Sequence, residues 1–123
     1  MYDHIGLKTK NLQASVRFYR AALEALGYRL GSSDESGASF LAESGAALYL
    51  GPASGAASSG VHVALSAPDR ASVTHFHRNG LEAGGRDNGA PGLRQDYSPN
   101  YFAAFLLDPD GNNIEAVCML SDK

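Results

Sequence analysis

Two stretches decide the fold: residues 4–27, HIGLKTKNLQASVRFYRAALEALG, and residues 62–85, HVALSAPDRASVTHFHRNGLEAGG. They align without a gap, and eight of the 24 aligned positions are identical: His4/His62, Leu7/Leu65, Phe18/Phe76, Arg20/Arg78, Leu23/Leu81, Glu24/Glu82, Ala25/Ala83 and Gly27/Gly85. A self-match at a fixed offset is the signature of a duplicated structural unit. The chain is therefore expected to fold as two similar halves.

Each copy predicts a strand followed by a helix. The alternating character of the first residues, beginning at His4 and at His62, is typical of a strand. Asn11 and the pair Pro68–Asp69 are suited to start the two helices. Apolar residues at helical spacing are expected to face the core: Leu12, Val16, Tyr19 and Leu23 in the first copy, and Val73, Phe76 and Leu81 in the second. Gly27 and the pair Gly84–Gly85 should end the helices.

The remaining segments complete each half with three more strands. In the first half these are Tyr28–Leu30, Ala38–Leu41 and Ala46–Leu50, followed by a small-residue linker at about 51–60. In the second half a loop over 86–100 precedes a hairpin, in which YFAAFLL and NIEAVCM flank the turn DPDGN. The prediction is an α+β fold of two βαβββ modules, at about 1–52 and 60–120, within a single domain spanning 1–123.

Composition and charge narrow the function. The chain has 123 residues, 44% of them hydrophobic, which suffices for a packed core. Its net charge of −3 and scattered basic residues argue against nucleic acid or an anionic membrane as partner. The N-terminus has no leader-like apolar region, no run is long enough to span a bilayer, and Cys118 is the single cysteine. We therefore expect a soluble, cytoplasmic protein.

Two histidines and a carboxylate form the candidate site. Strand alternation puts His4 on one face with Gly6, and the repeat puts His62 with Ala64 on the equivalent face. Glu115 interrupts an otherwise apolar final strand, where an unpartnered carboxylate would be costly. Converging on one face, the three would supply the facial triad of a divalent transition metal. The plainer interpretation, usual for any single histidine, is a half-exposed or hydrogen-bonded residue without a ligand.

The other polar candidates are weaker. His75 and His77 are two apart on a helix, so they do not face each other and are interpreted as ordinary helix residues. Cys118 lies three positions after Glu115 and should point to the opposite face as a structural thiol. Asn112 and Asn113 are assigned to the hairpin turn.

Three motifs resemble a known family. The pattern H-x-x-L-x-x-x-N-L-x-x-S-x-x-F-Y from His4 to Tyr19, the run GVHVAL, and the ending DPDGNNIEAV resemble the vicinal oxygen chelate superfamily. This group includes glyoxalase I, fosfomycin-resistance transferases, bleomycin-binding proteins and extradiol dioxygenases. The resemblance implies that the modules form a curled eight-stranded mixed sheet around a cleft, with helices on the outer face.

Residue by residue, the resemblance implies that His4, His62 and Glu115 are the metal ligands. Glyoxalase I has a second carboxylate where this chain has Tyr49, so glyoxalase I activity is not expected. The fosfomycin enzymes have a threonine where this chain has Gly6, and the extra catalytic residues of the dioxygenases are not identified here.

Residues 84–118 also resemble a glyoxalase-like subgroup of bacterial proteins, most of them without an assigned reaction. That subgroup often has histidines around Tyr97, where this chain has Asp96 and Ser98. Catalytic candidates besides Glu115 are Tyr49 and Tyr101, whose hydroxyls could donate a proton. Arg94, Tyr97 and Tyr101 lie in or beside the long loop and are the candidate substrate contacts.

Two functions remain open. In the first, a divalent ion (Mn, Fe, Ni or Zn) chelates adjacent oxygens of a small substrate, in a lyase, isomerase, transferase or dioxygenase reaction. In the second, the protein has no cofactor and sequesters a small molecule, as bleomycin-binding relatives do. A homodimer is expected in either case, and the sequence leaves open whether the site forms within one chain or across two.

Overall fold

The computed structural model describes residues 2–121. Within them, two helices and eight strands follow one another in the order β1 His4–Thr9, α1 Leu12–Glu24, β2 Arg29–Asp34, β3 Gly37–Leu41, β4 Ala47–Pro52, β5 His62–Ser66, α2 Arg70–Glu82, β6 Arg86–Leu93, β7 Phe102–Leu107 and β8 Asn113–Cys118. The two predicted βαβββ modules are confirmed: module 1 runs from β1 to β4, and module 2 runs from β5 to β8.

Each module forms its own mixed sheet. The strand orders are β1-β4-β3-β2 and β5-β8-β7-β6, so the two sheets have the same topology. In both, the first and last strands of the module pair in parallel and the other neighbours are antiparallel. The expected α+β fold is confirmed. The continuous eight-stranded sheet is not, because strand pairing within residues 2–121 does not connect one sheet to the other.

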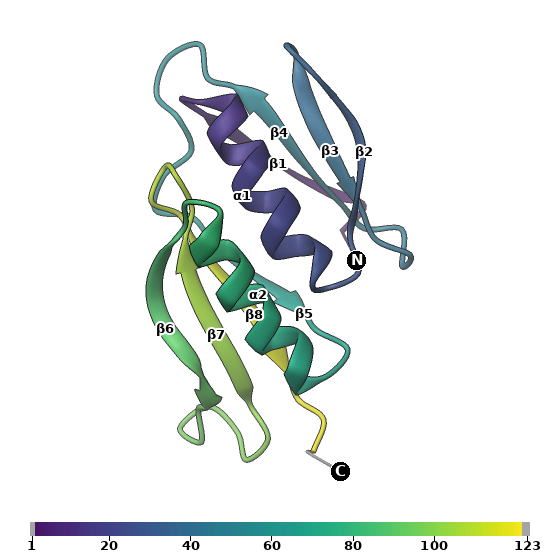
Figure 1. Cartoon of the computed structure of the whole chain (residues 1–123), viewed down its shortest axis with the longest axis vertical. Coiled ribbons are helices and arrows are strands. Elements are labelled where there is room, and N and C mark those ends of the chain that lie inside the picture. Colours follow the sequence, from purple (N-terminus) through teal and green to yellow (C-terminus); the bar gives the residue numbers. More distant parts are fainter. Residues whose placement is uncertain (1, 122–123) are drawn as a thin grey trace.

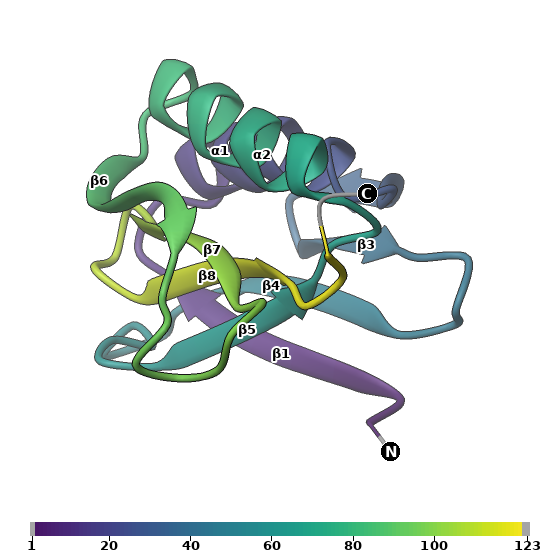
Figure 2. The same ribbon diagram turned by 90° about the horizontal axis from the view of Figure 1, so that it is seen from below.

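Both helices lie on the same side of the two sheets (Figures 1 and 2). They pack against each other at Gly80, where an added Cβ would lie 3.2 Å from Phe18 Cε1 and 2.3 Å from Leu106 Cδ1. A residue without a side chain is therefore needed at this crossing. Within residues 2–121 no helix covers the opposite face of either sheet, and we call it the open face of its module (Figure 2).

Capping residues and apolar spacing account for the helices. The side chains of Asn11 and Asp69 accept hydrogen bonds from backbone N–H groups in the first turn, as predicted. Phe18, Leu23 and Phe76 are fully buried. Leu81 was expected to face the core but is 39% exposed. The buried side of α2 runs through Val73, Phe76, His77 and Gly80, and Leu81, five residues after Phe76, lies to one side of it. Neither helix is long and apolar enough to cross a membrane.

The segment predicted as a loop over 86–100 is partly a strand. Residues Arg86–Leu93 form β6 and pair with β7, although the register shifts twice, on either side of Gly89. Glycine, proline, aspartate and asparagine disfavour strands, so their abundance here concealed β6 from sequence reasoning. Backbone hydrogen bonds to β7 hold the segment in place, and the bulges bend it.

A buried polar cluster links the two modules. Tyr19 of α1 donates its hydroxyl hydrogen bond to Asp108 Oδ2 at 2.5 Å, across the module boundary. Asp108 also accepts from the backbone and the side chain of Asn112. Asn112 in turn contacts the linker at Ser58 O and Val61 N. The DPDGN segment thus forms a turn, as predicted, and also joins module 1, the linker and module 2.

The first strands of the modules run in opposite directions where the modules meet (Figure 2). The end of β1 lies beside the linker, since Lys8 N donates to Ser58 Oγ at 2.9 Å. The start of β1 shares the wall of a hollow with the end of β5, since His4 and Ser66 both line it. The two modules are therefore related as by a twofold axis, and equivalent residues lie on opposite sides of that axis.

Candidate functional site

The open face of module 2 carries the sequence-predicted polar residues. In β5, Val63 and Leu65 are buried in the core, so His62 and Ala64 face the other way. In β8, Glu115 pairs with Ala64 in register and contacts His62. Sequence alternation therefore placed these side chains correctly on one face.

His62 and Glu115 form a close pair. His62 Nε2 lies 2.8 Å from Glu115 Oε1. The Glu115 side chain is only 2% exposed, whereas the His62 side chain is 54% exposed. With a carboxylate as partner, the hydrogen bond is one in which Nε2–H donates to Glu115. A buried carboxylate thus orients a histidine that solvent can reach.

Tyr101 satisfies the second oxygen of Glu115. Its hydroxyl donates a short hydrogen bond to Glu115 Oε2. The pKa of Tyr101 is raised to about 12, first by burial of the hydroxyl, then by the hydrogen bond to Glu115 and the charge of that carboxylate. Tyr101 therefore keeps its proton at neutral pH. Both oxygens of Glu115 have a partner, which explains how a carboxylate is tolerated in an apolar strand.

The segment between β6 and β7 brings two further predicted residues to this face. Arg94 N donates to Tyr101 O at 2.7 Å, so the ends of the segment are joined. Tyr97 packs edge-on against Tyr101, with ring centroids 4.9 Å apart, and is 64% exposed. The guanidinium carbon of Arg94 lies 5.3 Å from the centroid of the Phe105 ring. Arg94, Tyr97 and Tyr101 thus surround one side of Glu115 and Phe105.

The equivalent face of module 1 has a different chemistry. Tyr49 pairs in register with Gly6, as Glu115 does with Ala64, so Tyr49 is the structural counterpart of Glu115. The His4 ring stacks on Tyr49, with centroids 4.8 Å apart and planes inclined by 21°. His4 Nδ1 lies 2.9 Å from Asp3 Oδ1, and the side chain is 51% exposed. The assignment of Tyr49 from sequence therefore agrees with the register of the sheet.

The structure does not bring His4 to His62 and Glu115. His4 lies at the start of β1, near the end of β5, whereas His62 begins β5. Within residues 2–121 no group of three His, Cys, Asp or Glu side chains is arranged to hold a metal ion. One chain therefore supplies two neighbouring candidate ligands and a third on the other module.

The remaining sequence assignments have clear positions. His77 is buried, and its Nε2 lies 2.8 Å from Asp87 Oδ1, which links α2 to β6. The pKa of Asp87 is lowered, first by the backbone N–H of Gly89 and then by His77. Cys118 is buried in the core. Phe105 was not identified from sequence, and only its place opposite Glu115 in the hairpin could have indicated it.

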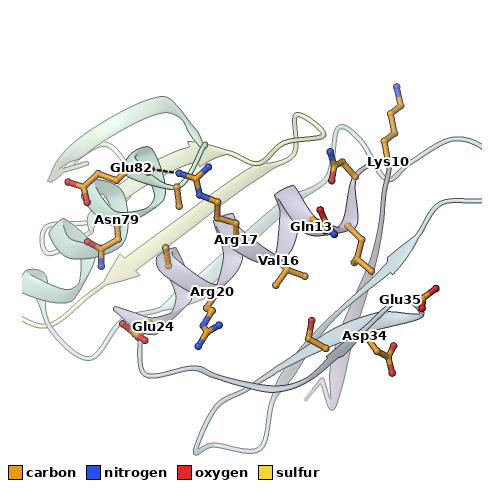
Figure 3. Close-up of a pocket in the computed structure, with 15 residues that line it drawn as sticks. Lys10, Gln13, Val16, Arg17, Arg20, Glu24, Asp34, Glu35, Asn79 and Glu82 are labelled. Atoms are coloured by element: carbon orange, nitrogen blue, oxygen red, sulfur yellow. Dashed lines mark hydrogen bonds between the residues drawn. The ribbon is translucent and has the colours of Figure 1, made fainter.

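A groove of about 1090 Å³ lies elsewhere, along the outer side of α1 (Figure 3). Its lining includes side chains of both charges, among them Arg17, Arg20, Glu24 and Asp34. Arg17 donates to the backbone oxygen of Glu82 at its edge. None of the predicted site residues lines this groove. We favour the open face of module 2 as the functional site, because it contains Glu115, a buried carboxylate held by two partners. The residues that line the groove include no such group.

Fold and site together define a small two-module α+β protein with polar side chains on helix-free sheet faces. The chain belongs to the Glyoxalase/Bleomycin resistance protein/Dioxygenase superfamily, whose family model matches residues 2–116. The resemblance inferred from the sequence motifs is thereby confirmed. No curated protein matches the sequence.

Solved structures share the fold over nearly the whole chain. A glyoxalase/bleomycin resistance protein from Albidiferax ferrireducens T118 is 26% identical, with a TM-score of 0.84 and coverage of 96% of this chain and 98% of that chain. A glyoxalase/bleomycin resistance protein/dioxygenase family enzyme from Burkholderia phytofirmans PsJN is 13% identical (TM-score 0.74, coverage 96% and 98%). A glyoxalase/dioxygenase from Nostoc punctiforme is 21% identical (TM-score 0.71, coverage 98% and 92%).

Proposed function

We propose that this protein is a metal-dependent enzyme that acts on a small molecule with two adjacent oxygens. The ligands would be His4, His62 and Glu115, and the ion would be Mn, Fe, Ni or Zn. The observation that supports this best is the pair formed by His62 and Glu115, an imidazole nitrogen and a carboxylate oxygen 2.8 Å apart on an open sheet face. These donor types suit a divalent transition metal.

The chemistry of the three ligands fits such an ion, but a single chain places only two of them next to each other. His62 and Glu115 would have to give up their mutual hydrogen bond to act as ligands, and His4 belongs to the other module. We therefore propose that the site is completed in a homodimer, in which His4 of the partner subunit joins the pair. Two features support this: both open faces lack a helix, and both histidine side chains are half exposed in one chain.

The residues around the ligands have distinct proposed roles. Tyr101 would hold Glu115 in place and, with its high pKa, remain a hydrogen-bond donor toward the carboxylate or a substrate oxygen. Tyr49 would fix the ring of His4 by stacking and present its hydroxyl, as its side chain is 41% exposed. The bound ion would supply Lewis acidity toward a substrate oxygen. Methylglyoxal isomerisation is not proposed, since Tyr49 replaces a carboxylate.

Mixing two inactive variants tests both the ligands and their distribution. His4→Ala and His62→Ala chains are each expected to lose the near-stoichiometric metal of the wild type, measured by mass spectrometry after removal of free ion. A heterodimer of the two contains one intact site across the interface, so it should regain about one ion per two chains. His75→Ala, on the exposed side of α2, is the matched control and should bind normally.

The outcomes are separable. No regain in the heterodimer would contradict a shared site while leaving each ligand assignment intact. Wild-type protein that binds none of the four ions would contradict metal dependence. That result would favour the alternative, a metal-free binding protein, for which the exposed aromatic side chains Tyr49 and Tyr97 provide stacking surfaces.

A further inference from the structure

A continuous row of residues crosses the open face of module 2. Strand register places Ala64, Glu115, Phe105 and Gly89 side by side on β5, β8, β7 and β6. Neighbouring strands are about 4.8 Å apart, so Gly89 lies about 10 Å from Glu115 along this row. The ring of Phe105 occupies the space between, and its centroid is 6.4 Å from that of His62.

Arg94 is fixed at the far end of this row. One terminal nitrogen, Nη1, donates to Gly92 O at 2.9 Å, and the other, Nη2, donates to Ala90 O at 2.7 Å. The guanidinium carbon lies 5.3 Å from the centroid of the Phe105 ring, which adds a cation–π interaction. The charged group is therefore held by three contacts, although its side chain begins in a surface segment.

Two glycines make room for this group. A Cβ added at Gly89 would lie 2.7 Å from Phe105 Cδ1 and 3.2 Å from Arg94 Nη2. A Cβ added at Gly92 would lie 3.2 Å from Arg94 Nη1. Gly89 also has a φ of +153°, which L side chains rarely adopt. The irregular register of β6 thus forms a cradle for the guanidinium of Arg94.

The charge of Arg94 has no counterpart within the described part of the chain. No Asp or Glu oxygen of residues 2–121 forms an ion pair with it. The carbonyl oxygens of Gly92 and Ala90 use two N–H groups of Arg94 and do not neutralise its charge. A guanidinium has five N–H donors, so further donors remain for a ligand. A carboxylate is the small group whose geometry matches the remaining donors best.

We propose that Arg94 binds a carboxylate of the substrate, whose apolar body lies on Phe105 and whose reacting oxygens reach His62 and Glu115. The last part rests on the proposed function, whereas the contact between Arg94 and the carboxylate does not. The substrate class is then a small carboxylic acid with an apolar spacer between its carboxylate and its reacting oxygens.

A matched pair of probes tests this in protein stripped of metal with EDTA. We expect 3-phenylpropionate to bind at least about tenfold more tightly than the neutral 3-phenylpropionamide, as measured by NMR titration, because hydrogen bonds to charged groups are the stronger ones. Arg94→Gln should abolish this preference. Arg86→Gln removes the same charge at the start of β6, the strand that ends just before Arg94, and should retain the preference.

Further variants separate this proposal from folding and from metal binding. Arg94→Lys keeps the charge but loses the planar fork, and we expect an intermediate preference. His62→Ala should keep the full preference even though it loses metal, so the two proposals fail independently. Equal affinity of the two probes for wild type, or an undiminished preference in folded Arg94→Gln, would overturn the carboxylate site.

Discussion

The open faces of the two modules are built alike but differ in chemistry. In module 2, His62 contacts the carboxylate of Glu115, whose other oxygen accepts from Tyr101. At the equivalent positions in module 1, His4 stacks on the ring of Tyr49. One face therefore has a closed polar network around a buried charge, and the other has an aromatic pair open to solvent. A duplicated backbone fixes where side chains stand, while single substitutions decide what they can bind.

Removing the charge of Glu115 is expected to have the largest effect on this comparison. Glu115→Gln keeps the size of the side chain but removes the carboxylate that would bind the metal and orient His62. We expect the affinity for divalent metal to fall at least about 100-fold, measured by competition with a chelating dye. Glu24→Gln, on the exposed side of α1, is the control. Unchanged affinity in Glu115→Gln would remove Glu115 from the ligand set.

Introducing a carboxylate into module 1, as in module 2, should raise metal affinity, by less than the loss expected for Glu115→Gln. Tyr49→Glu would place a carboxylate in the register position equivalent to Glu115, beside His4. With the site shared across a dimer, this adds a fourth ligand, and we expect metal affinity to rise about tenfold. Gln13→Glu adds the same charge on an exposed helix position and should change little. A loss of affinity would show that the stacking of His4 on Tyr49 matters more than added charge.

The titration of Tyr101 offers the smallest but most local test. Its pKa in the folded chain is about 12, above the value of about 10 expected when unfolded, so the folded state holds this proton more tightly. Its contribution to stability is therefore present below pH 10 and is lost as pH rises from 10 to 12.

The Tyr101→Phe variant isolates this contribution. The melting temperature of wild type should fall more steeply over pH 10 to 12 than that of Tyr101→Phe, measured by calorimetry. Tyr19 also has a pKa raised by burial, but it titrates equally in both proteins and cancels in the difference. Parallel pH curves would contradict the contact between Tyr101 and Glu115.

Much of the fold follows from the sequence because local and global signals agree. The repeat, the caps at Asn11 and Asp69 and the DPDGN turn each predict elements that the structure contains. The strand β6 could not be predicted, since its residues disfavour strands and only pairing with β7 holds it. The exposure of Leu81 was missed because the buried side of α2 continues through Gly80, a residue without a side chain, and not through the next apolar residue.

Only part of the candidate site could be predicted from the sequence in the same way. Alternation along β5 and β8 correctly put His62 and Glu115 on one face. Alternation also put His4 on the equivalent face of module 1. However, a twofold axis brings two equivalent residues together only when both lie near the axis, and His4 and His62 do not. The cradle around Arg94 has no periodic signal, because it depends on two glycines in an irregular strand.

The contact between Tyr19 and Asp108 makes the stability of one module depend on the other. Asp108 belongs to module 2 and is 2% exposed, and one of its hydrogen bonds comes from module 1. Asp108 keeps its hydrogen bonds from Asn112 if Tyr19 is changed, whereas the hydroxyl of Tyr19, a residue only 1% exposed, donates to Asp108. A buried hydroxyl left without its partner costs about 1–3 kcal/mol, a large fraction of the stability of a small protein. The two halves of the repeat are thus coupled, so a substitution at Asp108 in module 2 is felt as a loss of stability in module 1.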